Sequence, residues 1–196
     1  MKEKEKKPLT EQQYRELVRN LVSDYLEVYP EEGNRLAKLY SLLDEGLSLT
    51  DRKNFVGHLT ASAIVIDAAN RILLLHHRSL NKWLQPGGHV DGLELPLEAV
   101  LREIEEETSI SQLQPHPSLN NKQIPFDIDT HTIPANAQKH EAEHLHHDFR
   151  FLLLSSEEVI SIDESEVINS AWFDIEEAKS KSPDLPWQKI LDVLGL

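Results

Sequence analysis

Residues 88–110 read GHVDGLELPLEAVLREIEEETSI, a glycine-containing loop followed by a segment with helical periodicity. A helix over roughly residues 96–108 places apolar side chains on one face, because residues three and four apart are neighbours on a helix. These side chains are Leu97, Val100, Leu101, Ile104 and Thr108. The same geometry gathers Glu103, Glu106 and Glu107 on one flank, where like charges repel one another. The flank is either a solvated acidic surface or a site where Mg²⁺ or Mn²⁺, which prefer oxygen ligands, offsets the repulsion.

The spacing between the glycine loop and the glutamates matches a known pattern. Five residues separate Gly88 from Glu94, and seven more precede residues 102–110, which read REIEEETSI. This register resembles the Nudix box, G-x5-E-x7-R-E-U-x-E-E-x-G-U, where U is a bulky aliphatic residue. Eight of its nine fixed positions match, namely Gly88, Glu94, Arg102, Glu103, Ile104, Glu106, Glu107 and Ile110. A match of this length is far more specific than a lone glycine motif. The flanks at residues 84–88 and 171–174 are also similar, so the resemblance covers about residues 57–180.

Ser109 is the one departure from the pattern, because the family has glycine at this position. The residue just after a helix commonly adopts a left-handed conformation, which serine reaches only at some cost in free energy. The sequence therefore leaves the geometry of the loop after the helix open. The substitution removes no metal ligand, so we expect activity to survive.

The resemblance implies a hydrolase that uses divalent metal ions to cleave a phosphoanhydride bond. Glu103, Glu106 and Glu107 would be catalytic residues and metal ligands, joined by the backbone carbonyl of Gly88. Bound Mg²⁺ or Mn²⁺ would neutralise phosphate charge and lower the pKa of a water molecule that attacks phosphorus.

The resemblance also implies supporting roles around this helix. Arg102 would orient the glutamates, and Glu94 would hold the loop through hydrogen bonds. One glutamate would act as general base, and the sequence leaves its identity open. A carboxylate from the acidic stretch at residues 163–166 is one candidate, although that stretch equally fits an ordinary surface loop.

The periodicity of the whole chain predicts an α/β (α+β) architecture. Residues 9–47 have helical spacing interrupted by Pro30, which indicates an N-terminal helical hairpin. Expected strands lie at residues 60–66, 71–76, 83–90 (broken by the glycine loop), 126–132, 145–154 and 167–174, and expected helices at 96–108, 175–181 and 186–194. We predict a Nudix-like α/β/α sandwich with a mixed β-sheet. Residues 1–56 would form a helical extension packed on a hydrolase domain at residues 57–196.

Composition limits the classes of function and partner. The 196 residues suit one well-cored domain with a small appendage. The chain has no cysteine, which excludes disulfides, thiolate metal sites and cysteine nucleophiles. No apolar run is long enough to span a membrane, and a formal charge of −14 argues against a nucleic acid polymer as partner. We expect a cytoplasmic protein whose partner is a small phosphorylated substrate derived from a nucleotide. The apolar faces of the N-terminal helices fit either a homodimer interface or a lid over the core.

Five of the ten histidines lie between residues 131 and 147. On a strand, His144, His146, Asp148 and Arg150 would face one side together. That face indicates either an additional metal site, with Zn²⁺ at His144, His146 and Asp148, or a wall that contacts the phosphate or base of a substrate. A polar strand exposed to solvent is the alternative. His89, directly after the glycines, is a separate candidate for substrate contact.

Two other functions fit parts of the pattern. A non-catalytic module could sense a nucleotide through the same site, although every carboxylate of the box is present here. Isopentenyl diphosphate isomerases share the fold that the resemblance implies, but they depend on a reactive cysteine, which this chain lacks. The favoured interpretation is metal-dependent hydrolysis of a phosphoanhydride bond in a nucleoside diphosphate linked to another group.

Overall fold

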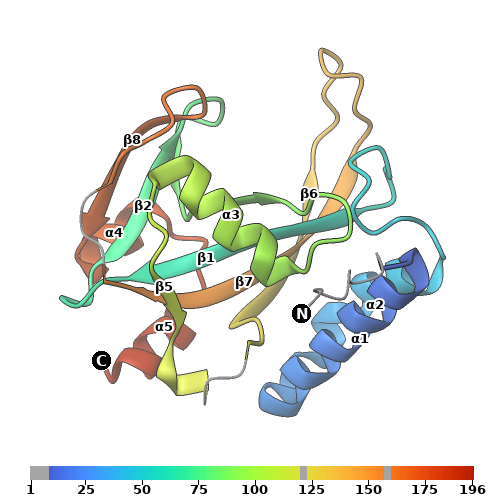
Figure 1. Cartoon of the computed structure of the whole chain (residues 1–196), viewed down its shortest axis with the longest axis horizontal. Coiled ribbons are helices and arrows are strands. Elements are labelled where there is room, and N and C mark those ends of the chain that lie inside the picture. Colours follow the sequence, from blue (N-terminus) through green and yellow to red (C-terminus); the bar gives the residue numbers. More distant parts are fainter. Residues whose placement is uncertain (1–8, 120–122, 157–159) are drawn as a thin grey trace, which may run out of the picture.

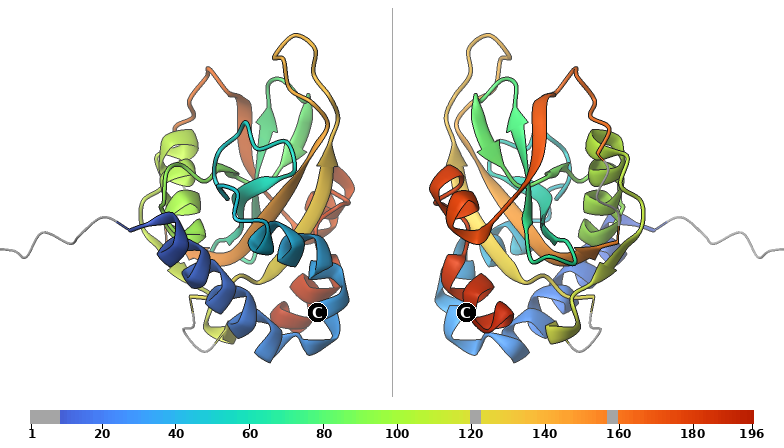
Figure 2. Two further views of the ribbon diagram at one scale, coloured as in Figure 1. Left: turned by 90° about the vertical axis from the view of Figure 1, so that its right-hand side faces the viewer. Right: turned by 90° about the vertical axis from the view of Figure 1, so that its left-hand side faces the viewer.

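The chain forms a central β-sheet with helices on both faces (Figure 1). A computed structural model describes residues 9–119, 123–156 and 160–196. Helix α3 (Pro96–Thr108) covers one face, and α4 (Ile175–Lys181) and α5 (Trp187–Leu194) lie on the other, as the side views of Figure 2 show. Within the described residues the sheet has eight strands and is mixed, with both parallel and antiparallel pairs. The predicted α/β/α architecture is confirmed.

The sheet is built around β1 (His58–Ile66), which is buried along its whole length. This strand runs antiparallel to β2 (Ile72–His77) and β4 (Gly87–His89), and parallel to β7 (His144–Ser155). The other strands pair further out: β3 (Lys82–Leu84) and β8 (Val167–Phe173) with β2, and β5 (Leu113–Pro115) and β6 (Asp127–Ile133) with β7. The glycine loop therefore enters the sheet directly beside its central strand.

Two details of the strand predictions differ from the structure. The extended piece expected over residues 83–90 is interrupted at residues 85–86, and the glycines lie inside β4. The interruption lets β3 and β4 pair with different strands, β2 and β1. Strand β5 was not predicted, because three residues that include a proline give no alternating pattern.

Helix α3 has the predicted ends, but its buried face is turned relative to the prediction. Ala99, Val100 and Ile104 are fully buried, whereas Leu97 and Leu101 are partly exposed and pack at the margin of the core. Glu107 is buried with them rather than lying on an exposed flank. One glutamate of the helix, Glu107, therefore lies in the interior of the protein.

The N-terminal segment consists of α1 (Glu11–Val28), a 3₁₀ helix η1 (Pro30–Leu36) and α2 (Ala37–Asp44). Thr10 begins α1 with a capping box, in which its hydroxyl accepts from the backbone N–H of Gln13. The buried stripe of α1 is Tyr14, Val18, Val22 and Tyr25, and it joins the same hydrophobic cluster as the core residues of α3. The sequence did not assign the two tyrosines to this stripe. Residues 1–8 of the predicted extension lie outside the described residues.

No helix in the described parts of the chain is long and apolar enough to cross a membrane. The division between residues 56 and 57, the homodimer and the cytoplasmic location stay predictions.

Ser109 adopts the left-handed conformation that the family's glycine would favour, with φ 59° and ψ 13°. Its backbone N–H donates to the Glu105 carbonyl at 2.8 Å, which closes the last turn of α3. The Ser109 hydroxyl donates to the Ser161 carbonyl at 3.3 Å. The helix therefore ends in the geometry typical of a glycine cap, and serine carries the conformational cost.

We expect Ser109→Gly to raise the free energy of unfolding by about 0.5–1 kcal/mol. Glycine removes the left-handed penalty, while its greater freedom in the unfolded chain and the lost hydroxyl contact offset part of the gain. Urea denaturation of the two proteins measures the difference. Ser111→Gly, two residues further along, is the comparison variant, and a Ser109→Gly protein less stable than the parent would contradict the interpretation.

Candidate active site

The glycine loop before α3 lies directly against the glutamates. Gly87 has φ +148°, and a Cβ at this position would lie 2.4 Å from the carbonyl oxygen of Ala61. A Cβ on Gly88 would lie 2.4 Å from Cδ of Glu103. Gly87 also donates its backbone N–H to Glu107 Oε2 at 3.1 Å. The missing side chains therefore bring the loop into contact with two of the predicted metal ligands.

Arg102 joins the loop to the helix through one guanidinium group. Its Nη2 donates to Glu94 Oε1 at 2.6 Å and to the His89 carbonyl at 3.1 Å. Its Nη1 donates to Glu103 Oε1 at 3.0 Å and to Glu106 Oε2 at 3.1 Å. The side-chain hydrogen bond with Glu94 is the main reason that the pKa of Arg102 lies above its usual value. These contacts suit the predicted roles of Arg102 and Glu94, which stay predictions.

Glu107 is the most buried carboxylate of the box, with 7% of its surface exposed. Burial raises the pKa of Glu107 to about 8; the Gly87 N–H opposes the shift, and the charges of Glu103, Glu166 and Glu106 add to it. Burial also raises the pKa of Glu103. Crowded, partly desolvated carboxylates of this kind are stabilised in their charged form by a nearby divalent cation.

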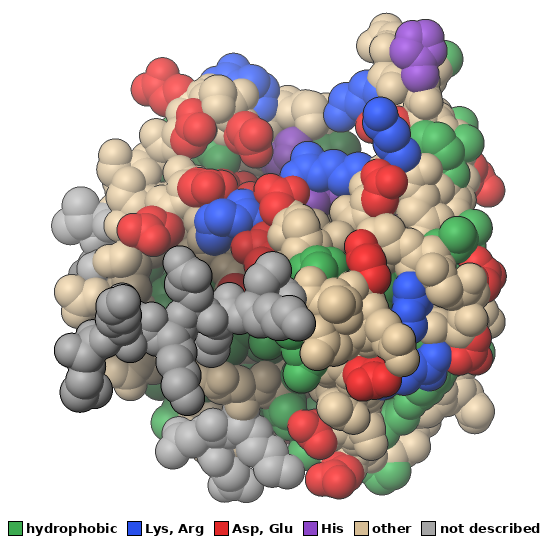
Figure 3. Space-filling model, turned by 45° about the vertical axis from the view of Figure 1, so that its right-hand side comes forward, with side chains coloured by type: hydrophobic (Ala, Val, Ile, Leu, Met, Phe, Trp, Pro, Cys, Tyr) green, Lys and Arg blue, Asp and Glu red, His purple; other side chains and the backbone are tan. Residues whose placement is uncertain are grey.

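The donor atoms of this group suit Mg²⁺ or Mn²⁺, because they are carboxylate and carbonyl oxygens. Figure 3 shows acidic side chains beside Lys and Arg side chains on one face of the molecule. Among the described residues, the three glutamates do not bring three oxygens within 4.8 Å of one another. Arg102 holds Glu103 and Glu106, whereas the Gly87 N–H holds Glu107. The structure thus places the three predicted ligands around the loop, each held by a hydrogen bond, and their role in metal binding stays a prediction.

The acidic loop at residues 163–166 packs against the C-terminal end of α3. The backbone N–H of Asp163 donates to the Glu107 carbonyl at 3.2 Å. The Asp163 carboxylate itself accepts from the backbone N–H of Ser165 at 2.8 Å. Glu166 differs from it, because its charge raises the pKa of both Glu103 and Glu107. Glu166 is therefore the carboxylate of this loop that acts electrostatically on the predicted metal ligands.

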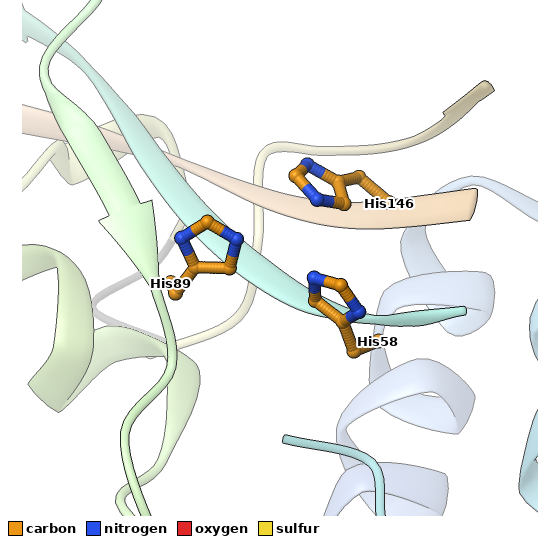
Figure 4. A group of neighbouring side chains, drawn as sticks. All are labelled: His58, His89 and His146. Carbon is orange, nitrogen blue, oxygen red and sulfur yellow. The ribbon is translucent and has the colours of Figure 1, made fainter. Parts of the chain in front are cut away.

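Three histidines from three strands meet beside the glycine loop. His58 lies on β1, His89 on β4 and His146 on β7, and one potential ligand atom from each lies within 4.8 Å of the others. The ring centroids of His58 and His146 are 4.7 Å apart, and those of His89 and His146 are 5.0 Å apart. Figure 4 shows the three rings around a common space. Burial lowers the pKa of His146 to about 2 and that of His89 to about 4, so both rings are neutral at physiological pH.

The structure groups a different set of potential ligands from the predicted zinc ligands His144, His146 and Asp148, whose role as a zinc site stays a prediction. Asp148 accepts hydrogen bonds from Thr60 Oγ1 at 3.1 Å and from Ser62 Oγ at 2.6 Å, and it lies 3.4 Å from Arg150 Nη2. Its two oxygens are therefore engaged within the sheet. His144 stays next to His146, and His58 and His89 complete the group. The sequence left His58 unassigned, because the parallel register that sets it opposite His146 joins segments far apart in the chain.

Comparisons with known proteins identify the family of the chain. The model of the NUDIX domain matches residues 57–191. The chain belongs to the Nudix hydrolase family. A relative from Lactococcus lactis subsp. cremoris, named a probable DHNTP pyrophosphohydrolase, is 31% identical over 147 residues, which are 74% of this chain and 84% of the relative.

Solved Nudix structures share the fold. A NUDIX-family hydrolase from Clostridium perfringens has a TM-score of 0.53 and 25% identity, covering 70% of this chain and 97% of that one. The dihydroneopterin triphosphate pyrophosphohydrolase of E. coli also has a TM-score of 0.53, with 18% identity over 70% of this chain and 96% of its own. At that identity the second likeness shows the fold alone.

Arg150 of the Nudix domain is buried, with 6% of its surface exposed. Its Nη1 donates to Asp127 Oδ2 at 2.7 Å. Arg150, Asp127 and Lys189 line a cavity of about 370 Å³ between the sheet and α5. The Arg150 guanidinium is already paired with the carboxylate of Asp127. A substrate-binding role for Arg150 stays a prediction.

Proposed function

We propose that this Nudix chain is a divalent-metal-dependent pyrophosphohydrolase acting on a nucleoside diphosphate linked to another group. The observation that carries the proposal is the buried Glu107 beside Glu103, Glu106 and the glycine loop. Glutamates crowded in this way are suited to hold cations against an anionic diphosphate. The name of the Lactococcus relative, a pyrophosphohydrolase, supports the same type of reaction.

In this proposal Glu103, Glu106, Glu107 and the Gly88 carbonyl hold Mg²⁺ or Mn²⁺. The bound ion supplies charge neutralisation and a water molecule of lowered pKa. Arg102 sets the positions of the glutamates through Nη1 and ties them to the loop through the His89 carbonyl.

We assign the general base to Glu166. Its charge acts on both Glu103 and Glu107, whereas the Asp163 carboxylate is engaged with the backbone of its own loop. A base must lie within reach of the attacking water, and the influence of the Glu166 charge on the pKa values of Glu103 and Glu107 favours this residue over Asp163.

The test is a panel of dinucleotides, nucleotide sugars, nucleoside triphosphates and dihydroneopterin triphosphate, each incubated with Mg²⁺ or Mn²⁺. We expect at least one compound to release phosphate, pyrophosphate or a monophosphate only when the metal is present. If no compound is cleaved but one binds, the chain is a nucleotide sensor. Isomerisation of isopentenyl diphosphate is a further arm of the panel, and we expect none because the chain has no cysteine.

Gly88→Ala is expected to reduce turnover of the cleaved compound by about 100-fold, the order of effect that follows from misplacing a catalytic group by about 1 Å. The added methyl group would occupy space held by the Glu103 carboxylate, which can swing away at little cost to the fold. Steady-state kinetics and urea denaturation separate the two effects. Gly87→Ala is the matched variant, because its methyl group would meet backbone atoms of β1. We expect this variant to differ from the parent mainly by a lower free energy of unfolding. Unchanged turnover in Gly88→Ala would argue against a role for the Glu103 position.

A further inference from the structure

The three histidines form a second group of potential metal ligands, chemically distinct from the glutamates. His58 is buried, with 1% of its surface exposed, and its Nε2 has no hydrogen-bond partner. A buried, unpaired polar atom is costly, and native structures usually satisfy such atoms with a protein group, a water molecule or an ion. One ring nitrogen of His58 lies within 4.8 Å of ring nitrogens of His89 and His146, so an ion that binds several imidazoles is a suitable partner for this group.

Hydrogen bonds to backbone carbonyls fix which ring nitrogen carries the proton in His58 and in His144. His58 Nδ1 lies 3.4 Å from the Asn54 carbonyl, which can accept only from an Nδ1–H and so leaves the lone pair on Nε2. His144 Nδ1 donates in the same way to the Ala142 carbonyl at 2.8 Å. The Nε2 of His144 then carries a lone pair and lies 3.3 Å from the Nε2 of His146. Metal-binding histidines typically donate their other ring nitrogen to such acceptors.

We propose that His58, His89 and His146 bind one Zn²⁺-class divalent ion, with the fourth position open to water or to an oxygen of the substrate. Three imidazoles with an open fourth position are a recognised zinc arrangement. Mg²⁺ favours oxygen ligands, so this site and the glutamate site select different ions. The nearby Arg52 guanidinium is paired with Asp91 at 2.9 Å, which reduces its repulsion of a cation.

An ion bound at the three histidines would also support the glycine loop. The three ligands come from β1, β4 and β7, so one ion would fasten these strands together at the end where β4 carries Gly88. The His89 carbonyl accepts from Arg102, which also holds Glu103. An ion bound to the His89 ring would therefore also restrict the motion of the His89 carbonyl, which accepts a hydrogen bond from Arg102.

The full-length chain, first freed of metal with a chelator, is titrated with Co²⁺ in the presence of excess Mg²⁺. Co²⁺ serves as a spectroscopic probe for Zn²⁺, and Mg²⁺ competes for the carboxylate site. We expect one equivalent to bind with the absorption of a nitrogen-ligated, four-coordinate ion. His146→Gln and His89→Gln should weaken binding at least about 100-fold, because even the outer partners of metal-bound histidines contribute about 10–100-fold. Addition of Zn²⁺ at about 100 times its Kd should raise the Tm of the parent by about 5–10 °C and leave that of the variants unchanged.

Two control variants keep this test separate from the proposed function. His116→Gln removes a histidine outside the cluster and should bind Co²⁺ like the parent. Glu107→Gln should lose hydrolysis and keep Co²⁺ binding. Binding that survives in both cluster variants, or that disappears in Glu107→Gln, would overturn the histidine site while leaving the hydrolase proposal intact. His89 is partly exposed, so His89→Gln is expected to stay folded even if His146→Gln does not.

Discussion

Glu107→Gln is expected to reduce the rate of metal-dependent hydrolysis by about 1000-fold, within the range typical of a lost catalytic carboxylate. Glutamine keeps the shape of the side chain, and its oxygen can still accept the hydrogen bond from the Gly87 N–H. The negative charge is lost, and with it the contribution of Glu107 to cation binding. Burial raises the pKa of Glu107 to about 8, so a neutral side chain at this position should not destabilise the fold. The measurement is kcat for the best compound of the panel across a titration of Mn²⁺.

The matched control is Glu105→Gln, on the same helix but exposed and outside the fixed positions of the motif. It removes the same charge from α3 and should retain most of the activity of the parent. Glu106→Gln should act in the same direction as Glu107→Gln, since both belong to the predicted ligand set. Persistent activity in Glu106→Gln and Glu107→Gln together would mean that the metal-ligand assignment is wrong.

The grouping of the glutamates, Arg102 and the glycine loop was largely predictable because these residues are close in sequence. The segment from Gly88 to Glu107 contains one short loop and most of α3, and Arg102 reaches back across that loop to Glu94. Such contacts follow from helix geometry and a short connection. Burial of Glu107 was not predictable in this way, since it depends on how α3 is turned against the sheet.

The grouping of the histidines and the choice of Glu166 as general base could not be predicted in this way, because both depend on contacts between segments far apart in the sequence. His58 meets His146 through the parallel register of β1 and β7, which brings together residues 88 positions apart. Alternation along β7 predicted which of its side chains share a face, but gave no information on the strand beside it. In the same way, Glu166 could be distinguished from its neighbours only once its loop was seen against the end of α3.

Asp127→Asn is expected to lower the free energy of unfolding by roughly 3–5 kcal/mol, the cost typical of removing one partner from a buried ion pair. Asp127 has 2% of its surface exposed. Its carboxylate accepts from Arg150 at 2.7 Å and from Lys189 at 3.1 Å, and it lies 3.5 Å from Arg35. These partners belong to β7, α5 and η1, so a single carboxylate links the sheet, the C-terminal helix and the N-terminal segment. Asparagine leaves the buried Arg150 guanidinium without its closest counter-charge.

The control is Asp44→Asn, which removes the same charge from a solvent-exposed ion pair with Arg19. Side-chain exposures of 36% for Arg19 and 71% for Asp44 place this pair at the surface, where loss of a partner costs about 1 kcal/mol or less. Urea denaturation of both variants measures the contrast. Combining Asp127→Asn with Lys189→Met tests whether the two side chains act as one network, because residues in direct contact depart from additivity by more than about 0.5 kcal/mol. Equal losses in Asp127→Asn and Asp44→Asn would show that the buried carboxylate does not connect the N-terminal helices to the Nudix domain energetically.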